Sequence, residues 1–176
     1  MEVNLPYGSE IVKVKVPKES KVEVLNPKSV GVLPDPKEAV IQAISSSVDL
    51  DFDYLLKDSK KISVIIDDVT RKTPTKVILP LLLEKLREHR ISKDQINIVI
   101  ALGSHRPMTE KEIKQKVGEE IFKTYQIINS EFRDKSKMSS LGFTDDGIEI
   151  WVDKRVVQSD LKIGIGAEHA ANLGGM

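Results

Sequence analysis

Polar side chains follow three apolar segments of the sequence, at the point where each segment ends. The segments and their polar tips are residues 62–66 with Asp67-Asp68-Val69-Thr70-Arg71, residues 96–102 with Gly103-Ser104-His105-Arg106, and residues 161–166 with Ala167-Glu168-His169. Short, continuous, β-branched runs are typical of buried strands. If the three strands belong to one parallel sheet, we expect their polar tips to gather at one edge.

Four of these polar side chains could do chemistry: Asp68, Arg71, His105 and His169. An arginine presents a planar fork that suits a carboxylate or a phosphate. Thr70 and Thr73 add hydroxyls near a predicted helix start, which is itself an anion site. Histidine has an ordinary pKa of ~6.5, so it can give or take a proton at neutral pH. The pattern predicts an anion-binding corner with two imidazoles that could serve two faces of one small substrate.

Several of these residues also have an ordinary structural interpretation. Asp67 is more typical of a turn or cap than of a catalyst, and Asp68 could be either. Arg71 could simply pair with one of these two carboxylates. His105 is different, because Gly103 marks a close backbone approach and no apolar periodicity accounts for an imidazole there. The role of His169, taken alone, is ambiguous.

Composition excludes several classes of protein. The 176 residues carry 27 basic and 27 acidic side chains and no cysteine, so disulfides, thiolate nucleophiles and cysteine-based metal sites are excluded. No bulk field attracts nucleic acid or an anionic membrane. The sequence has no dinucleotide fingerprint, Walker motif or zinc-protease motif. The first residues do not resemble a signal peptide and no apolar run could span a bilayer, so we expect a cytoplasmic protein without nucleic-acid or membrane partners.

Residues 1–33 predict a small antiparallel β unit. Apolar and basic residues alternate over 11–16. After a short polar connection, residues 22–25 are expected to form the partner strand. Alternation at period two predicts one buried and one solvated face. Tyr7-Gly8 is typical of a turn. The alternative is that the Tyr7 phenol belongs to the functional site.

Residues 34–176 predict an α/β core. Asp35-Pro36 and Thr109 with Glu112 are helix starts, Thr73-Pro74 begins another helix that Pro80 either kinks or delays, and Gly118 interrupts a third. Residues 125–128 form a further strand, and residues 138–143 and 148–152 form a hairpin. The fold class is α/β: a Rossmann-like, mainly parallel sheet with flanking helices, preceded by the small antiparallel unit. In such sheets ligands bind beyond the carboxyl ends of the strands.

Five stretches together resemble the amino-terminal domain of the nickel-pincer-dependent lactate racemase family. They are Tyr7-Gly8, Asp35-Pro36-x-x-Ala39, Asp68-Val69-Thr70-Arg71-x-x-Pro74, Ala101-Leu102-Gly103-Ser104-His105-Arg106-Pro107-Met108-Thr109, and Asp160-Leu161 onward to His169. The segment around His105 is the most specific of them, and the resemblance spans nearly the whole chain.

The resemblance implies a 2-hydroxy-acid racemase or epimerase of the lactate type. A histidine takes the proton of the substrate hydroxyl while the α-hydrogen passes as hydride to a nickel-pincer pyridinium mononucleotide. By motif, His105 and His169 are the paired acid–base residues, and Arg71 holds the substrate carboxylate. Asp68 and Thr70 lie on the cofactor side, and no residue of this sequence is assigned to the metal.

The sequence departs from the family pattern after His169. The family continues to a lysine that carries the cofactor and then to a carboxy-terminal domain, whereas here Gly174-Gly175-Met176 follows and the lysine is absent. We therefore expect that this chain alone neither holds the cofactor nor racemises lactate, and that it works with the missing domain or a partner chain. Its open cleft face could also be covered by homodimerisation. The alternative is a non-catalytic module of the same fold that binds a small anion, a nucleotide or a partner.

Overall fold

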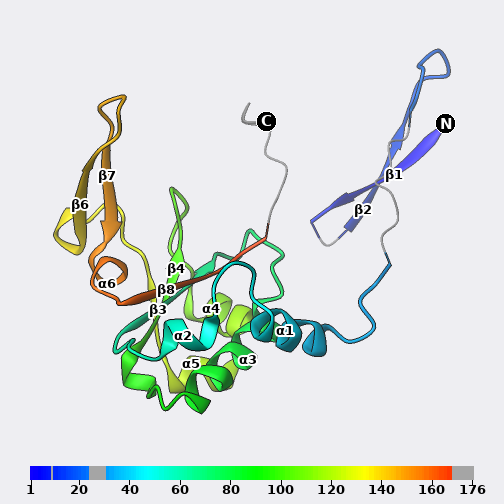
Figure 1. The fold of residues 1–176 in the computed structure, drawn as a ribbon. Helices are drawn as coiled ribbons and strands as arrows, with labels where there is room; N and C mark the ends of the chain where they lie inside the picture. The colour runs from blue at the N-terminus through cyan, green and yellow to red at the C-terminus, as the bar shows by residue number, and fades with distance from the viewer. Residues whose placement is uncertain (9, 24–30, 168–176) are drawn as a thin grey trace. The chain divides into compact units, whose positions relative to one another are not determined.

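The computed structural model describes residues 1–8, 10–23 and 31–167. The chain divides into two compact units, Met1–Val32 and Leu33–Met176 (Figure 1). The first is a β ribbon and the second is an α/β unit. Each unit is described by itself below.

The first unit is a two-stranded antiparallel ribbon of β1 (Glu2–Tyr7) and β2 (Glu10–Lys15). The predicted strand over 11–16 is present, but its partner is the segment before it, because the turn at Gly8 folds β1 directly back onto β2. The proposed partner over 22–25 was wrong in its described half, since Val22 and Glu23 lie outside any strand; residues 24 and 25 lie outside the described residues.

The expected buried face of this ribbon was also wrong. Side chains that share one face include Leu5, Tyr7, Val12 and Val14, and all of them are exposed. A two-stranded ribbon has no layer of its own to cover an apolar face, so alternation alone does not bury it.

The second unit contains a four-stranded parallel sheet of β3 (Ile62–Asp67), β4 (Ile96–Ala101), β5 (Gln126–Asn129) and β8 (Leu161–Ile165). The strand order is β5-β4-β3-β8, and every neighbouring pair is parallel. The predicted α/β fold with a Rossmann-like parallel sheet is confirmed. Because all four strands are parallel, their carboxyl ends lie at one edge.

Six helices occur in the described part of the chain: α1 (Pro36–Ser45), α2 (Phe52–Leu56), α3 (Thr75–Glu88), α4 (Glu110–Val117), α5 (Glu119–Thr124) and α6 (Lys154–Val157). The caps predicted at Asp35 and Thr109 are present, and the Thr109 hydroxyl and Glu112 carboxylate form a reciprocal capping box. Pro80 lies on the exposed side within α3, so it does not mark the helix start. Gly118, at φ +94°, separates α4 from α5 as expected.

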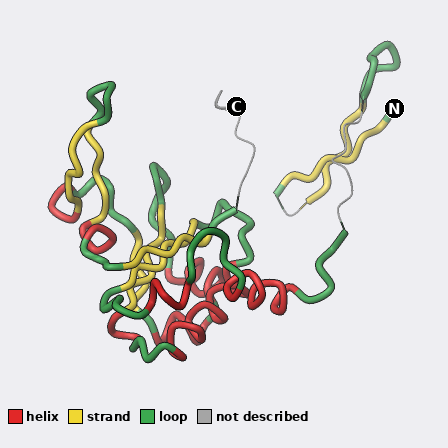
Figure 2. Tube along the Cα trace, in the orientation of Figure 1, coloured by secondary structure: helices red, strands yellow, loops and turns green. Residues whose placement is uncertain are grey.

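The core lies between one face of the sheet and helices α3, α4 and α5, which lie on the same side of the strands (Figure 2). Alternate residues of the central strands face it: Ile62, Val64, Ile66, Ile96, Ile98 and Ile100, each at most 2% exposed. The opposite face is covered differently, since Ser63 bonds there to Ser159 at 2.7 Å and contacts the segment containing α6. One face of β3 therefore packs against α3, α4 and α5, and the other meets the segment that contains α6.

The predicted hairpin is confirmed as β6 (Met138–Phe143) paired with β7 (Glu149–Asp153), a separate two-stranded sheet. Short 3₁₀ turns at Lys93–Gln95 and Lys135–Lys137 precede β4 and β6. Within the described ranges, none of the helices has the length and apolar character needed to cross a membrane.

Candidate active site

A cleft of about 260 Å³ lies at the carboxyl edge of the sheet, between the segments that follow β3 and β4. Its lining comes from two strand tips: Asp67, Asp68, Arg71, Ala101, Leu102, Gly103, Ser104 and His105. The structure thus brings together Asp68, Arg71 and His105. His169 and Glu168 lie outside the described residues, so the shared cleft of the two histidines stays a prediction.

Asp68 and His105 form a hydrogen-bonded pair across the two tips. His105 Nδ1 lies 2.5 Å from Asp68 Oδ2. The carboxylate is buried, with 5% of its side chain exposed, whereas 45% of the imidazole is exposed. A carboxylate at Nδ1 favours the tautomer with the proton on Nδ1, which leaves Nε2 as the free acceptor. The pair therefore has the arrangement of a histidine general base and the carboxylate that orients it.

Thr70 holds the other oxygen of the same carboxylate. Its backbone N–H and its hydroxyl donate to Asp68 Oδ1 at 2.8 and 2.6 Å. Burial raises the pKa of Asp68, but the hydrogen bonds from Thr70 and His105 outweigh burial and keep the pKa below its ordinary value of 3.8. Asp68 is consequently an anion at neutral pH.

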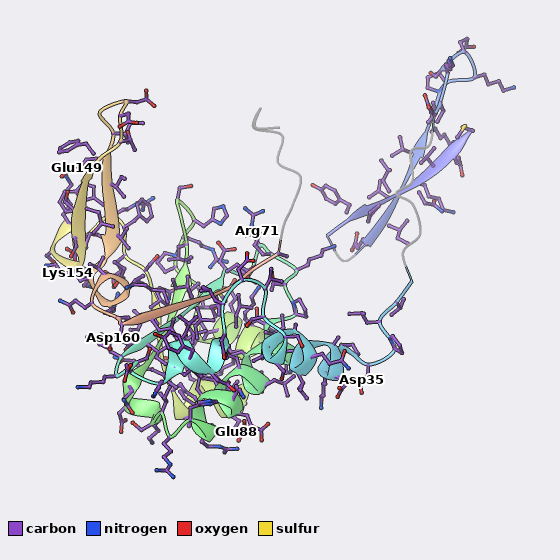
Figure 3. The ribbon with its side chains drawn as sticks, viewed as in Figure 1. Asp35, Arg71, Glu88, Glu149, Lys154 and Asp160 are labelled. Atoms are coloured by element: carbon purple, nitrogen blue, oxygen red, sulfur yellow. The ribbon has the colours of Figure 1, made fainter. Side chains whose placement is uncertain are left out.

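Arg71 is exposed beside this pair, on the loop after β3 (Figure 3). Its backbone N–H donates to the Asp68 carbonyl at 3.2 Å, which closes a turn. The guanidinium does not pair with Asp67 or Asp68, which contradicts the structural interpretation of this arginine. Among the described residues it forms no ion pair, so its planar fork is available to an anion in the cleft.

Lys116 was not predicted to lie at this site, yet its side chain is 7% exposed and contacts the loop after β3. Its ammonium lies 2.5 Å from Asp67 Oδ1 and donates to the carbonyls of Asp68 and Arg71 at 3.0 Å each. Asp67 also accepts from the Thr73 hydroxyl. The interpretation of Asp67 as a structural residue agrees with these contacts. A lysine among four other charged residues in α4 carries no sequence signal that distinguishes it from a solvated one.

The segment that carries His105 is anchored at both of its ends. Gly103 has φ +55°, and the His105 N–H donates to the Leu102 carbonyl at 2.9 Å to close the turn. Further along, the Met108 N–H and carbonyl both bond to the Asn129 amide at 3.0 Å. The turn and the amide pair limit where the imidazole can lie.

Arg106 and Glu112 form a bidentate ion pair at 2.9 and 2.6 Å. The Arg106 guanidinium, followed by the bonds from Thr109, lowers the pKa of Glu112 to about 2. Arg106 is therefore paired and is not a second anion-binding arginine.

No cluster of three or more histidine, aspartate or glutamate side chains that could hold a metal ion occurs in the part of the chain that the structure describes. The polar groups that line the cleft are two carboxylates, an imidazole, a serine hydroxyl and one arginine, and the arginine and imidazole suit an organic anion beside a histidine base. These groups do not by themselves form a nickel site.

The model for the lactate racemase N-terminal domain matches residues 7–174. The chain belongs to that family. Curated lactate racemases from Thermoanaerobacterium thermosaccharolyticum and Lactiplantibacillus plantarum are 29% and 31% identical to it over 93% and 74% of its length. The structure of the lactate racemase apoprotein from T. thermosaccharolyticum matches with a TM-score of 0.77 and 27% identity over 93% of the chain.

The chain spans only part of these lactate racemases: 39% and 31% of the two curated sequences and 38% of the solved chain. The match therefore concerns the amino-terminal part of a larger racemase. The predicted family membership is confirmed at that level.

Proposed function

We propose that this chain is the amino-terminal catalytic part of a racemase or epimerase that acts on 2-hydroxy acids such as lactate. The observation that supports it best is the Asp68–His105 pair beside the available guanidinium of Arg71, in a chain of the lactate racemase N-terminal domain family. Racemisation by hydride transfer through a keto acid uses a base for the hydroxyl proton, and a cation can hold the carboxylate; both kinds of group line the cleft.

In the proposed mechanism, Arg71 binds the substrate carboxylate through two parallel N–H···O bonds. His105 Nε2 accepts the hydroxyl proton, and the Asp68 anion stabilises the imidazolium that results. His169 does the same from the other face of the substrate. Return of the α-hydrogen to the opposite face of the planar keto acid would invert the carbon centre, while a histidine gives the proton back to the oxygen.

The proposed cofactor is the nickel-pincer pyridinium mononucleotide. When bound, it supplies the acceptor for the α-hydrogen as hydride. Asp68 and Thr70 are the residues of this chain proposed to lie beside it. Thr70 bonds to Asp68 and Asp68 bonds to His105, so in this proposal they orient the base and would place an anion beside a positively charged ring.

Racemisation assays of the cofactor-loaded protein that contains this sequence test the proposal. Wild type should convert one lactate enantiomer into the other. Loss of general-base catalysis should lower kcat of His105→Asn by about 10²–10⁴-fold, whereas Arg71→Gln should mainly raise KM. Arg87→Gln, at an exposed arginine of α3, is the matched control and should behave as wild type.

A wild-type rate in His105→Asn would contradict the assignment of the base. Lactate binding without turnover by the loaded protein would instead favour the non-catalytic anion-binding module. The 176-residue chain alone should show neither racemisation nor stoichiometric nickel by elemental analysis.

A further inference from the structure

We infer that Glu112 and Lys116, here called the α4 pair, are positioning residues that hold the Asp68–His105 hydrogen bond together. The inference deepens the proposed function, because it concerns how the proposed base is oriented. It rests on contacts that α4 makes with the two loops of the cleft.

Lys116 determines the position of the loop after β3. Its ammonium has three N–H groups and contacts three acceptors: the Asp67 carboxylate and the carbonyls of Asp68 and Arg71. Of these, Asp68 bonds to His105 and Arg71 lines the cleft. Its charge is paired with Asp67, two of its N–H groups donate to carbonyls and its side chain is 7% exposed, so Lys116 is not placed to bind substrate.

Glu112 determines the position of the loop after β4. One of its oxygens accepts from the Thr109 N–H and hydroxyl at 2.8 and 3.0 Å, and its carboxylate accepts two bonds from Arg106. Arg106 directly follows His105 in the chain. Glu112 therefore links α4 to the loop that carries the imidazole.

The two members of the α4 pair are four residues apart, so they lie on one face of the helix, one turn from each other. Asp68 and His105 belong to different loops, and the 2.5 Å bond between them forms only if both loops keep their places. A shift of about 1 Å in either loop would lengthen this bond beyond the normal hydrogen-bonding range. One rigid helix that contacts both loops limits such shifts.

Lys116→Met tests the inference, because methionine keeps most of the side-chain volume and removes the ammonium. The readout is the His105 Nδ1–H resonance of the 176-residue chain in ¹⁵N-edited NMR near neutral pH. In wild type, the bond to Asp68 should protect this proton from exchange with water and make it visible. In Lys116→Met we expect the resonance to be lost. The assay uses no cofactor, substrate or turnover, so the inference can fail while the racemase proposal stands, and the reverse.

Two matched controls separate positioning from stability. Val117→Ala changes the neighbouring α4 residue, which is 1% exposed and packs in the core, so it should lower the melting temperature yet keep the resonance. Lys111→Met removes an exposed charge from the same helix and should change neither.

A folded Lys116→Met that keeps the resonance would overturn the inference. So would a wild-type spectrum without the resonance, or loss of the resonance in Val117→Ala. If Lys116→Met does not fold, Asp67→Asn carries the test. It weakens the ion pair with Lys116 and leaves both carbonyl contacts. Loss of the resonance in Asp67→Asn supports the inference, and its retention at wild-type intensity overturns it.

Discussion

The β1–β2 ribbon and the β3–β4 pair contain similar β-branched residues, yet they differ in what covers them. In the ribbon, Leu5 is 48% and Val14 37% exposed, whereas Val64 and Ile98 of the parallel sheet are 0% exposed. The difference comes from α3, α4 and α5, which pack on one face of the sheet. A strand pair thus becomes a core only when a third element covers its apolar face.

The same difference separates the two regions chemically. The described residues of the ribbon include no buried carboxylate, whereas Asp68, at the edge of the parallel sheet, is both buried and hydrogen-bonded through each of its oxygens. Burial strengthens its interaction with His105, because water does not screen it. The proposed site therefore lies beside the buried core of the α/β unit, and four variants test how far burial determines stability in the two regions.

The largest effect should come from Ile98→Ala in the centre of β4. The side chain is fully buried, so its loss removes apolar contacts and leaves a cavity, at a cost of about 2–5 kcal/mol in the free energy of unfolding. Urea unfolding followed by fluorescence of the single tryptophan, Trp151, measures it. The matched control is Ile11→Ala in the ribbon, 71% exposed, which should change little. Equal losses in the two variants would contradict the comparison.

Asp68→Asn should destabilise the chain in a pH-dependent way. The folded-state pKa of Asp68 lies below its ordinary value of 3.8, so its ionised form stabilises the fold above that pH. This contribution is lost as the pH falls through the lowered pKa. The difference in unfolding free energy between wild type and variant should therefore be largest near neutral pH and shrink steadily in acid below about pH 4. A difference that is independent of pH would show that Asp68 acts through packing alone.

Thr109→Ala should cost about 1 kcal/mol, because the α4 capping box loses its hydroxyl. Thr124→Ala serves as the control, since the Thr124 hydroxyl bonds only to the Glu120 carbonyl at the exposed end of α5. Thermal unfolding of both variants measures the effect. The cap would matter less than proposed if the two melting temperatures fell equally.

The smallest effect should come from Leu5→Thr on the ribbon. Its side chain is 48% exposed and threonine suits a strand, so unfolding of the α/β unit should change by less than about 0.5 kcal/mol. Trp151 lies in the α/β unit, and its fluorescence follows the unfolding of that unit. A loss comparable to that of Ile98→Ala would reveal that another surface covers the ribbon.

Much of the fold could be predicted because its signals are local. The Asp35 and Thr109 caps join residues two or three positions apart, and Gly118 breaks a helix through its own backbone angle. The continuous apolar runs before Asp67 and Leu102 predicted parallel strands, and parallel strands place their tips at one edge. Asp68, Arg71 and His105 were therefore predicted to lie together.

The pairing of the first strand could not be predicted in the same way. Residues 11–16 alternate equally well for a partner on either side, and the choice of β1 depended on the turn at Gly8. Its apolar face was expected to be buried. Periodicity predicts which residues share a face, but it does not predict whether another element packs against that face.

Sequence alone therefore determined the strands of the parallel sheet, the helix caps, the family and the residue types of the cleft, because each depends on neighbours along the chain. Only the tertiary structure decided which groups pair there. His105 meets a carboxylate 37 residues away, and Lys116 meets the Asp68 carbonyl 48 residues away. Such contacts depend on strand order and on how α4 packs, and no local pattern of residues encodes those distances.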